Sequence, residues 1–389
     1  MNKFLVIIIG FLFCTACESD TKTNHKSSKK ASNYNLIIKD SLAMPINNKD
    51  YYFSYFTHVT KIKDSTYLIR DNYFNNSIDI YNWNTKQKTK NYTYKYEGPN
   101  GIKSFGGAAI YPISLNSFFI LTINGRLYIT KETSVVYQTK PQLEKSKEFI
   151  RSYGLNAHSP VLSNNKIFFY IPADYLISQD KLYLKRPLIA SFDLNTKKIH
   201  RCSISVPKVY DKPCWDPTQG GMSFTKNNKK ELIALFSVLN KLYIYNIKKD
   251  SVINKITFKS KYVNEIKPMS KCDYGNNDKF NRYLKNTAIY KNIVYDKYKD
   301  AYYIFVMLPL KKEKIQDGNP NFAEVMPFSI IVLDKNYQKL TEQKFNPKTF
   351  QIMDYFVTEE GLWISNNNPK NPNFNEDELS FSLFKLEKK

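Results

Sequence analysis

Two cysteines, Cys14 and Cys17, are the first residues in the sequence whose spacing could do chemistry. A Cys-x-x-Cys pair binds a metal or exchanges disulfides when a folded strand and helix hold it. Here the pair ends an apolar run, residues 4–13, that follows Lys3. That run is too short for a bilayer span, which takes about 20 residues, and is typical of a secretory signal peptide. We therefore expect neither a redox pair nor a metal pair.

The residues around Cys17 favour lipid attachment. The small residues Thr15 and Ala16 precede it and a polar segment follows it, which resembles a bacterial lipobox, although Cys14 stands where the usual motif has Leu. In such a motif Cys17 becomes the lipidated first residue of the mature chain. The sequence thus predicts a protein anchored by lipid to the outer membrane, on the periplasmic side or at the cell surface. The expected division is a lipoprotein signal peptide at 1–16, a flexible tether at 17–33 and a folded domain at 34–389.

Histidines are the next candidates for acid–base or metal chemistry. The chain has only four, and no two of them have a metal-ligand spacing, so we expect no metal site and no cofactor. His58 and His158 are the best acid–base candidates, but for His58 we favour a hydrogen-bonded residue that lines the central channel over a catalytic one. No G-x-S-x-G motif marks a serine nucleophile. The sequence identifies no catalytic residue.

Several charged or acidic residues stand beside aromatic ones in long loops. Such pairs suit a saccharide or a peptide, because the ring stacks and the charge strengthens a hydrogen bond. Packing of the loops against one another explains them equally well. The candidate ligand-binding residues are His58, Arg151, Tyr153, His158, Trp215, Asp216 and Arg282.

Three cysteines other than Cys17 remain after loss of the signal segment: Cys202, Cys214 and Cys272. An oxidising cell envelope permits disulfides. Cys214 and Cys272 lie in consecutive long loops, so we predict a disulfide between them. Cys202 is then expected to be a free, buried thiol.

Internal repeats predict the elements that position these residues. A strand–turn–strand pattern recurs six times, and its third strand is the clearest part of each copy. These third strands are "SIDIYN" (77–82), "GRLYIT" (125–130), "LIASFD" (188–193), "KLYIYN" (241–246), "SIIVLD" (329–334) and "SFSLFK" (380–385). The sixth copy lacks a fourth strand, whereas 34–44 is a spare strand at the start. Pairing the two closes a ring. The predicted fold is all-β, a six-bladed β-propeller whose last blade is closed by the N-terminal strand.

The turns and loops of this propeller divide between its two faces. The turns after the first and third strand of each copy are short and share one face. The long insertions fall on the other face, where functional residues of a rigid scaffold usually lie. These insertions are 98–107, 142–158, 174–187, 208–221, 261–286, 311–326 and 366–378.

The net charge of +23 raises the question of nucleic-acid binding. Only six of the 58 basic residues are Arg, the residue favoured for bidentate contacts to phosphates and bases. The lysines are scattered through turns. We therefore expect no nucleic-acid partner.

The lipobox, the six-blade count and the turn Glu97–Gly98–Pro99–Asn100–Gly101 resemble a family of Bacteroidetes β-propeller lipoproteins that carry a domain of unknown function. The resemblance implies the fold and an envelope location, but no reaction. The expected function is a ligand-binding or protein-interaction scaffold that uses the loop-rich face, with an envelope protein or a saccharide as partner. The alternative is an envelope hydrolase or lyase that acts on a saccharide or lactone at the channel mouth.

Overall fold

A computed structural model describes residues 33–141, 158–171, 187–211, 214–215, 221–269, 277–310 and 322–389. The chain divides into two units, Met1–Ala31 and Ser32–Lys389, and all described residues belong to the second. The predicted boundaries of the signal peptide and the tether therefore lie outside the described residues.

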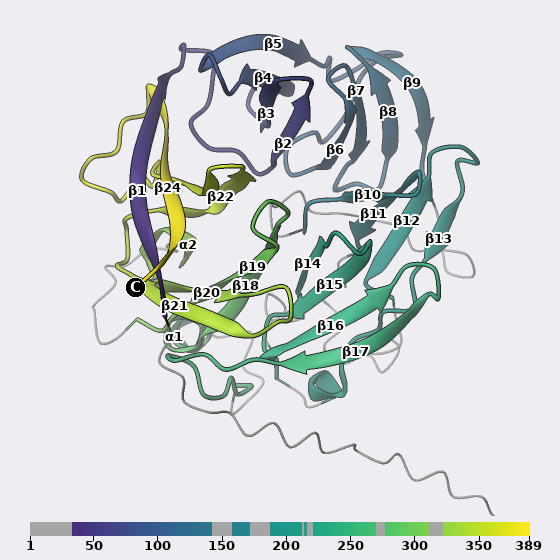
Figure 1. Ribbon diagram of the computed structural model, residues 1–389. Coiled ribbons are helices and arrows are strands. Elements are labelled where there is room, and N and C mark those ends of the chain that lie inside the picture. The colour runs from purple at the N-terminus through teal and green to yellow at the C-terminus, as the bar shows by residue number, and fades with distance from the viewer. Residues whose placement is uncertain are drawn as a thin grey trace, which may run out of the picture. The chain divides into compact units, whose positions relative to one another are not determined.

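Six antiparallel four-stranded sheets form the second unit and are arranged around a common axis (Figure 1). The first blade is β2 (Thr57–Ile62), β3 (Ser65–Asn72), β4 (Ser77–Asn82) and β5 (Gln87–Thr93). The second is β6 (Ala109–Ser114), β7 (Ser117–Leu121), β8 (Leu127–Lys131) and β9 (Ser134–Thr139). The third is β10 (Val161–Ser163), β11 (Lys166–Tyr170), β12 (Ile189–Asp193) and β13 (Ile199–Arg201). The fourth is β14 (Met222–Lys226), β15 (Glu231–Phe236), β16 (Lys241–Asn246) and β17 (Ser251–Thr257).

The fifth blade is β18 (Ile289–Asp296), β19 (Ala301–Met307), β20 (Phe328–Leu333) and β21 (Lys339–Phe345). The sixth is β22 (Gln351–Thr358), β23 (Gly361–Ser365), β24 (Glu378–Lys388) and β1 (Tyr34–Pro45). The N-terminal strand therefore supplies the outermost strand of the last blade. It is paired from Tyr34 opposite Lys388 to Pro45 opposite Glu378, with a shift of register between Ile38 and Asp40. This confirms the predicted six-bladed propeller and the way in which its ring is closed.

Apolar side chains fill the space between the sheets. Successive side chains of a strand point to opposite faces of its sheet, and here both faces are buried. The middle strands β7, β15, β19 and β20 are almost wholly buried. Four hydrogen bonds and one ring contact near the axis then link the innermost strands of neighbouring blades. These contacts are Thr57–Asp354, His58–Tyr111, Leu162–Lys226, Ser223–Ile293 and Asn292–Ile352.

Several of the short hairpin turns share one pattern of hydrogen bonds. The residue that ends a third strand, such as Asn82, Asp193 or Asn246, accepts backbone N–H groups two and three residues later with its side-chain oxygen. Four residues after that acceptor the backbone is left-handed, as at Lys197 with φ of 60°. Asn and Asp favour such turns because their short side chains replace backbone acceptors. We call the face that carries these turns the short-turn face.

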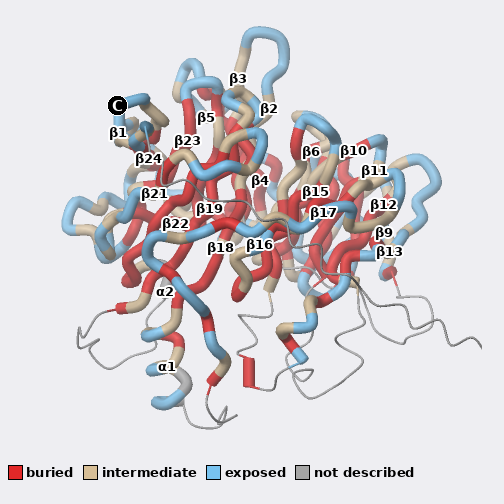
Figure 2. Tube along the Cα trace, turned by 60° about the horizontal axis from the view of Figure 1, so that its bottom comes forward, coloured by how far each residue is buried: buried red, intermediate tan, exposed pale blue. Residues whose placement is uncertain are grey.

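The opposite face carries the longer connections, and we call it the loop-rich face. Helix α1 (Asn277–Asn286), helix α2 (Phe322–Val325) and the 3₁₀ turn η4 (Lys208–Asp211) all belong to it. In Figure 2, α1 and α2 lie on the side opposite the β2–β3 turn. The sequence predicts 261–286 only as a loop, so α1 is an addition to the predicted fold.

The turn at 97–101 owes its glycines to backbone geometry. Gly98 has a φ of +93°, a region that residues with a side chain rarely adopt. A Cβ on Gly101 would lie 2.5 Å from the carbonyl carbon of Glu97. The glycines that mark this segment in the sequence are therefore needed for a tight turn and form no phosphate cradle.

Candidate functional site

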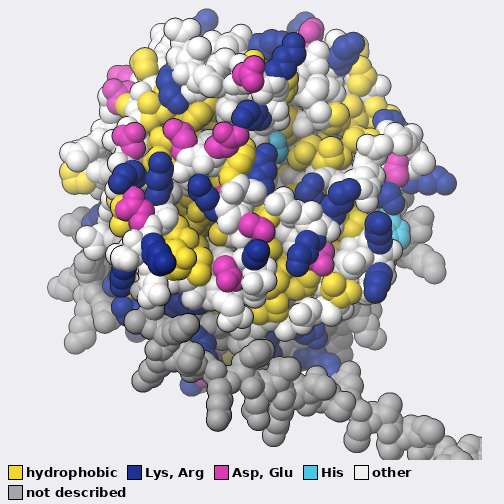
Figure 3. Space-filling model, viewed as in Figure 1, with side chains coloured by type: hydrophobic (Ala, Val, Ile, Leu, Met, Phe, Trp, Pro, Cys, Tyr) yellow, Lys and Arg dark blue, Asp and Glu magenta, His cyan; other side chains and the backbone are white. Residues whose placement is uncertain are grey.

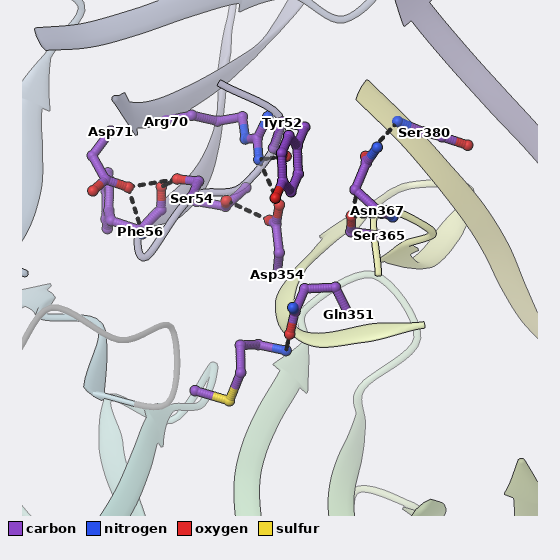
Figure 4. A network of polar contacts seen from close by, with 12 residues as sticks. Tyr52, Ser54, Phe56, Arg70, Asp71, Gln351, Asp354, Ser365, Asn367 and Ser380 are labelled. Carbon is purple, nitrogen blue, oxygen red and sulfur yellow. Dashed lines mark hydrogen bonds and ion pairs between the residues drawn. The ribbon is translucent and has the colours of Figure 1, made fainter. Parts of the chain in front are cut away.

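A buried ion pair joins the first and last blades beneath the loop-rich face. The Arg70 guanidinium on β3 lies 2.5 Å from a carboxylate oxygen of Asp354 on β22, and both side chains are almost fully buried. Arg70 also donates to the carbonyl of Tyr52, and Thr57 donates to the other oxygen of Asp354 (Figure 4). Burial raises the pKa of Asp354, and the Arg70 charge partly offsets that rise.

Asp71 holds the adjacent segment of chain. Its Oδ1 accepts hydrogen bonds from the Ser54 hydroxyl at 2.6 Å and from the Phe56 N–H at 2.8 Å. Burial raises the pKa of Asp71 to about 6, although these two hydrogen bonds and Arg70 oppose the rise. Figure 4 shows Asp71, Ser54 and Phe56 on one side of Arg70, with Asp354 on the other. Asp71 and Arg70 together fix the path of residues 52–56.

Those fixed residues belong to a run of aromatic side chains that we call the aromatic cluster. Its members come from three connections on the loop-rich face: the segment before β2, the β3–β4 turn and the β23–β24 loop. They are Tyr51, Tyr52, Phe53, Tyr55, Tyr73, Phe74 and Phe374.

Ring geometry shows that the cluster is continuous. The Tyr51 ring centroid lies 4.5 Å from that of Tyr52, 5.3 Å from that of Tyr73 and 4.2 Å from that of Phe74. Tyr52 in turn packs edge-on against Phe374 at 4.8 Å. Offset and edge-to-face pairs at these distances are the favoured arrangements of aromatic rings.

The cluster is open to solvent at its rim. Phe74 is 62% exposed, and Tyr51, Tyr52 and Tyr73 are partly exposed. Burial of its inner side raises the pKa of Tyr51 to about 12, so the phenol stays neutral and can donate a hydrogen bond. A partly exposed row of rings with neutral hydroxyls can stack on a flat apolar face and bond to polar groups around that face.

Asparagine side chains hold the β23–β24 loop that presents Phe374. Asn367 donates to the carbonyls of Asn375 and Glu378, and Asn368 donates to the carbonyl of Phe350. The Asn-rich sequence of 366–375 is thus used internally to satisfy backbone carbonyls. The loop thus supports the Phe374 ring, and the side-chain amides of Asn367 and Asn368 are used in its internal hydrogen bonds.

The structure places the two predicted histidines on innermost strands or beside them. His58 on β2 stacks on Phe56 and meets the Tyr111 ring edge-on, and burial lowers its pKa to about 4. His158 stacks on Tyr170 with centroids 4.3 Å apart, and burial lowers its pKa to about 3. Both imidazoles are therefore neutral at physiological pH and packed against rings.

The other predicted ligand-binding residues are dispersed or lie outside the described residues. Trp215 is buried, donates from Nε1 to the carbonyl of Val209 and packs against Tyr210, which is the geometry of a packing residue. Arg282 is exposed on α1. Arg151, Tyr153 and Asp216 lie outside the described residues, so their roles stay predictions.

The cysteines follow the predicted pattern as far as they are described. Cys202 is a buried free thiol. Cys214 is disulfide-bonded, and the predicted partner, Cys272, lies outside the described residues, as does Cys17. The pairing of Cys214 with Cys272 stays a prediction.

The aromatic cluster and the buried network were both missed in the sequence, yet each had a signal there. The run "YYFSYF" at 51–56 is the densest group of aromatic residues in the chain. Arg70, Asp71 and Asp354 are charged residues inside apolar strands, where a charge is costly unless it is paired. Which of these charges face one another depends on ring closure, which no local pattern reveals.

The described ranges contain neither a candidate metal cluster nor a candidate membrane span. Within those ranges no group of three or more His, Cys, Asp or Glu side chains could hold a metal ion. No helix among the described segments is long and apolar enough to cross a membrane.

Comparison with known proteins gives a family and a fold. The family model for a domain of unknown function, DUF4221, matches residues 33–344. No curated protein matches the chain. The crystal structure of a DUF4221 member from Bacteroides vulgatus is 23% identical, with a TM-score of 0.80 over 92% of this chain and 100% of that one. A candidate exported protein from Bacteroides fragilis is 12% identical, with a TM-score of 0.54 over 94% of this chain and 98% of the other.

The solved relatives are less than 25% identical, so the likeness to them concerns the fold alone. The family match covers most of the propeller, including residues 51–56 of the aromatic cluster and the turn at 97–101. It extends over more than half of the chain. The protein therefore belongs to the DUF4221 family and is a six-bladed β-propeller.

Proposed function

We propose that the protein is an outer-membrane lipoprotein, attached through lipid on Cys17, whose loop-rich face binds a saccharide. The observation that carries the binding part is the aromatic cluster, which combines stacked rings, neutral hydroxyls and a solvent-exposed rim. The signal-like segment before Cys17 supports export, as does the resemblance to the candidate exported protein from Bacteroides fragilis.

A saccharide fits this surface for physical reasons. Sugar rings present flat C–H faces that pack on aromatic rings, and hydroxyls around their edge that accept hydrogen bonds from phenols. The Arg70–Asp354 pair and Asp71 fix the segment that carries Tyr52 and Tyr55, so little ordering is needed on binding. Such preorganisation increases affinity because fewer side chains lose freedom in the complex.

The test of saccharide binding is isothermal titration with soluble oligosaccharides from bacterial envelope polysaccharides. Phe74→Ala removes an exposed ring and Tyr51→Ala a partly exposed one, and each should weaken binding about two- to tenfold. Tyr262→Ala is the matched control, since Tyr262 is an exposed tyrosine of another loop, 37% accessible. An equal loss in Tyr262→Ala, or no saturable binding by the wild type, would contradict the proposal.

The lipid anchor has its own test. The intact mass of the N-terminal peptide should carry the mass of acyl chains on Cys17, and the protein should partition into detergent. Cys17→Ser should shift it to the aqueous phase. A wild-type peptide without added lipid would refute the anchor and leave the saccharide test unaffected.

We favour a binding scaffold over the alternative, a hydrolase or lyase at the channel mouth. His58 and His158 have pKa values lowered by burial, to about 4 and about 3, which makes them weak bases. Among the described residues neither imidazole is paired with a carboxylate that could orient it.

A further inference from the structure

The short-turn face displays a set of outward-pointing lysines. They lie in the hairpin turns and are exposed, and Figure 3 shows Lys and Arg side chains spread across this face, interspersed with fewer Asp and Glu. The exposed lysines of these turns include Lys63, Lys229, Lys230, Lys248, Lys249, Lys297, Lys299 and Lys335.

Several acidic residues of the same turns accept hydrogen bonds, whereas Asp64, Glu132, Glu359 and Glu360 are exposed. Asp193 and Asp334 accept backbone N–H groups of their own turns, and Asp250 accepts the hydroxyl of Tyr245 and the N–H of Ser203. These carboxylates are only partly exposed. The eight exposed lysines named above outnumber these four exposed acidic residues, so the turns of this face carry a net positive charge.

Four of the exposed lysines, in the fourth and fifth blades, are suitable for substitution. Within the described part of the chain, Lys229, Lys248, Lys299 and Lys335 take part in no ion pair, so their ammonium groups are available to an external anion. The loop-rich face also has exposed lysines, and four of them are Lys95, Lys208, Lys259 and Lys370. The effect of four substitutions on membrane binding can therefore be compared between the two faces.

The start of the propeller also lies at the short-turn face. Strand β24 runs from the loop-rich face to the short-turn face, and β1 is antiparallel to it, so β1 begins at the short-turn face. The N–H of Lys389 donates to the carbonyl of Asn33 at 2.7 Å, which places both ends of the propeller there. The segment that leads back to Cys17 therefore joins the propeller at its cationic face.

We propose that the short-turn face binds the anionic surface of a lipid bilayer, and that the loop-rich face points away from that membrane. The orientation rests on the proposed lipid anchor at Cys17, whereas the binding surface does not. Each lysine that comes within about 10 Å of an anionic bilayer contributes a roughly equal favourable free energy of binding. A lipid chain and a basic patch are two signals that reinforce each other in membrane attachment.

The test uses the full chain with Cys17→Ser, so that any vesicle binding is independent of lipidation. Binding is measured by co-sedimentation with phosphatidylcholine vesicles, with and without phosphatidylglycerol, at about 0.1 M salt and above. Variant one combines Lys229→Glu, Lys248→Glu, Lys299→Glu and Lys335→Glu. Variant two combines Lys95→Glu, Lys208→Glu, Lys259→Glu and Lys370→Glu. Both variants have the same net charge, and circular dichroism checks that both are folded.

We expect binding only to the vesicles with phosphatidylglycerol, and weaker binding as salt rises. Variant one should lose more than about tenfold in partition coefficient, and variant two less than about twofold. Equal losses in the two variants would show that net charge alone acts and would overturn the proposal, as would equal binding to neutral vesicles. Because Cys17 is absent from every sample, failure of the lipid anchor cannot be mistaken for failure of this surface.

Discussion

Arg70 on β3 and Asp354 on β22 form a buried ion pair 2.5 Å long between the first and last blades. The pair lies near the axis, whereas the β1–β24 pairing lies at the outer edge of the last blade. The ring is therefore closed twice, by backbone hydrogen bonds on the outside and by opposite charges on the inside. The two closures involve residues from opposite ends of the sequence.

Loss of one partner of this pair should be far more costly than loss of both. Arg70→Met or Asp354→Leu leaves one buried charge without its partner and should lower the free energy of unfolding by about 3–5 kcal/mol. The double variant should be less destabilised than either single variant, because no buried charge is left without its partner. Urea denaturation of the four proteins in the cycle measures the coupling. Additive losses would show that the two charges do not interact in solution.

Asp71 should make the protein more stable as the pH falls. Its pKa is about 6 in the folded state and about 3.9 in an unfolded chain, so between pH 7 and pH 4 only the folded state takes up this proton. The stabilisation is complete below about pH 4 and is lost as the pH rises through 6, with a total on the order of 3 kcal/mol. The difference in unfolding free energy between wild type and Asp71→Asn, measured across this range, isolates the effect. A difference that does not change with pH would contradict it.

Gly361 should tolerate no side chain. Its φ is +148°, and a Cβ would lie 2.6 Å from the carbonyl oxygen of Phe384. Gly361→Ala should therefore lower the free energy of unfolding by at least about 1–3 kcal/mol. Gly106→Ala is the control, since the nearest atom to its Cβ would be 3.6 Å away. Thermal denaturation of both variants compares them, and equal melting temperatures would be the contrary result.

Cys202 should be inert in the native protein. Burial raises the pKa of its thiol to about 12, and only the thiolate reacts with iodoacetamide. Mass spectrometry should find no alkylation of the Cys202 peptide at pH 8 without denaturant and complete alkylation with it. Cys214, being disulfide-bonded, should need a reductant as well. Rapid native labelling of Cys202 would indicate that the core between β13 and its neighbours opens readily.

The fold could be predicted because each blade repeats a local signal. Strands β4 and β16 have the predicted bounds, since their apolar runs end at the turn-forming residues Asn82 and Asn246. The closing strand was predicted by elimination, because the last copy lacked a fourth strand. Helix α1 was not, because its one amphipathic face covers only ten residues and depends on the propeller that it packs against.

For the candidate site, only its location on the loop-rich face could be predicted from the sequence. Three separate connections bring the rings of Tyr51, Phe74 and Phe374 together, and their meeting depends on how blades one and six are placed. The predicted Trp215 has the right residue type but is buried. Burial of an aromatic side chain in a loop depends on neighbours that are distant in sequence, which the local pattern does not contain.

The pairing of β1 with β24 has a mechanical consequence. The chain that leads to Cys17 leaves β1 at Tyr34, while the hydrogen-bonded register continues as far as Pro45. A pull on that chain directed along β1 loads the strand lengthwise, so its hydrogen bonds share the force and do not break one after another. The strand that completes the last blade thus also acts as a shear clamp, through which any force between the segment before Tyr34 and the propeller must pass.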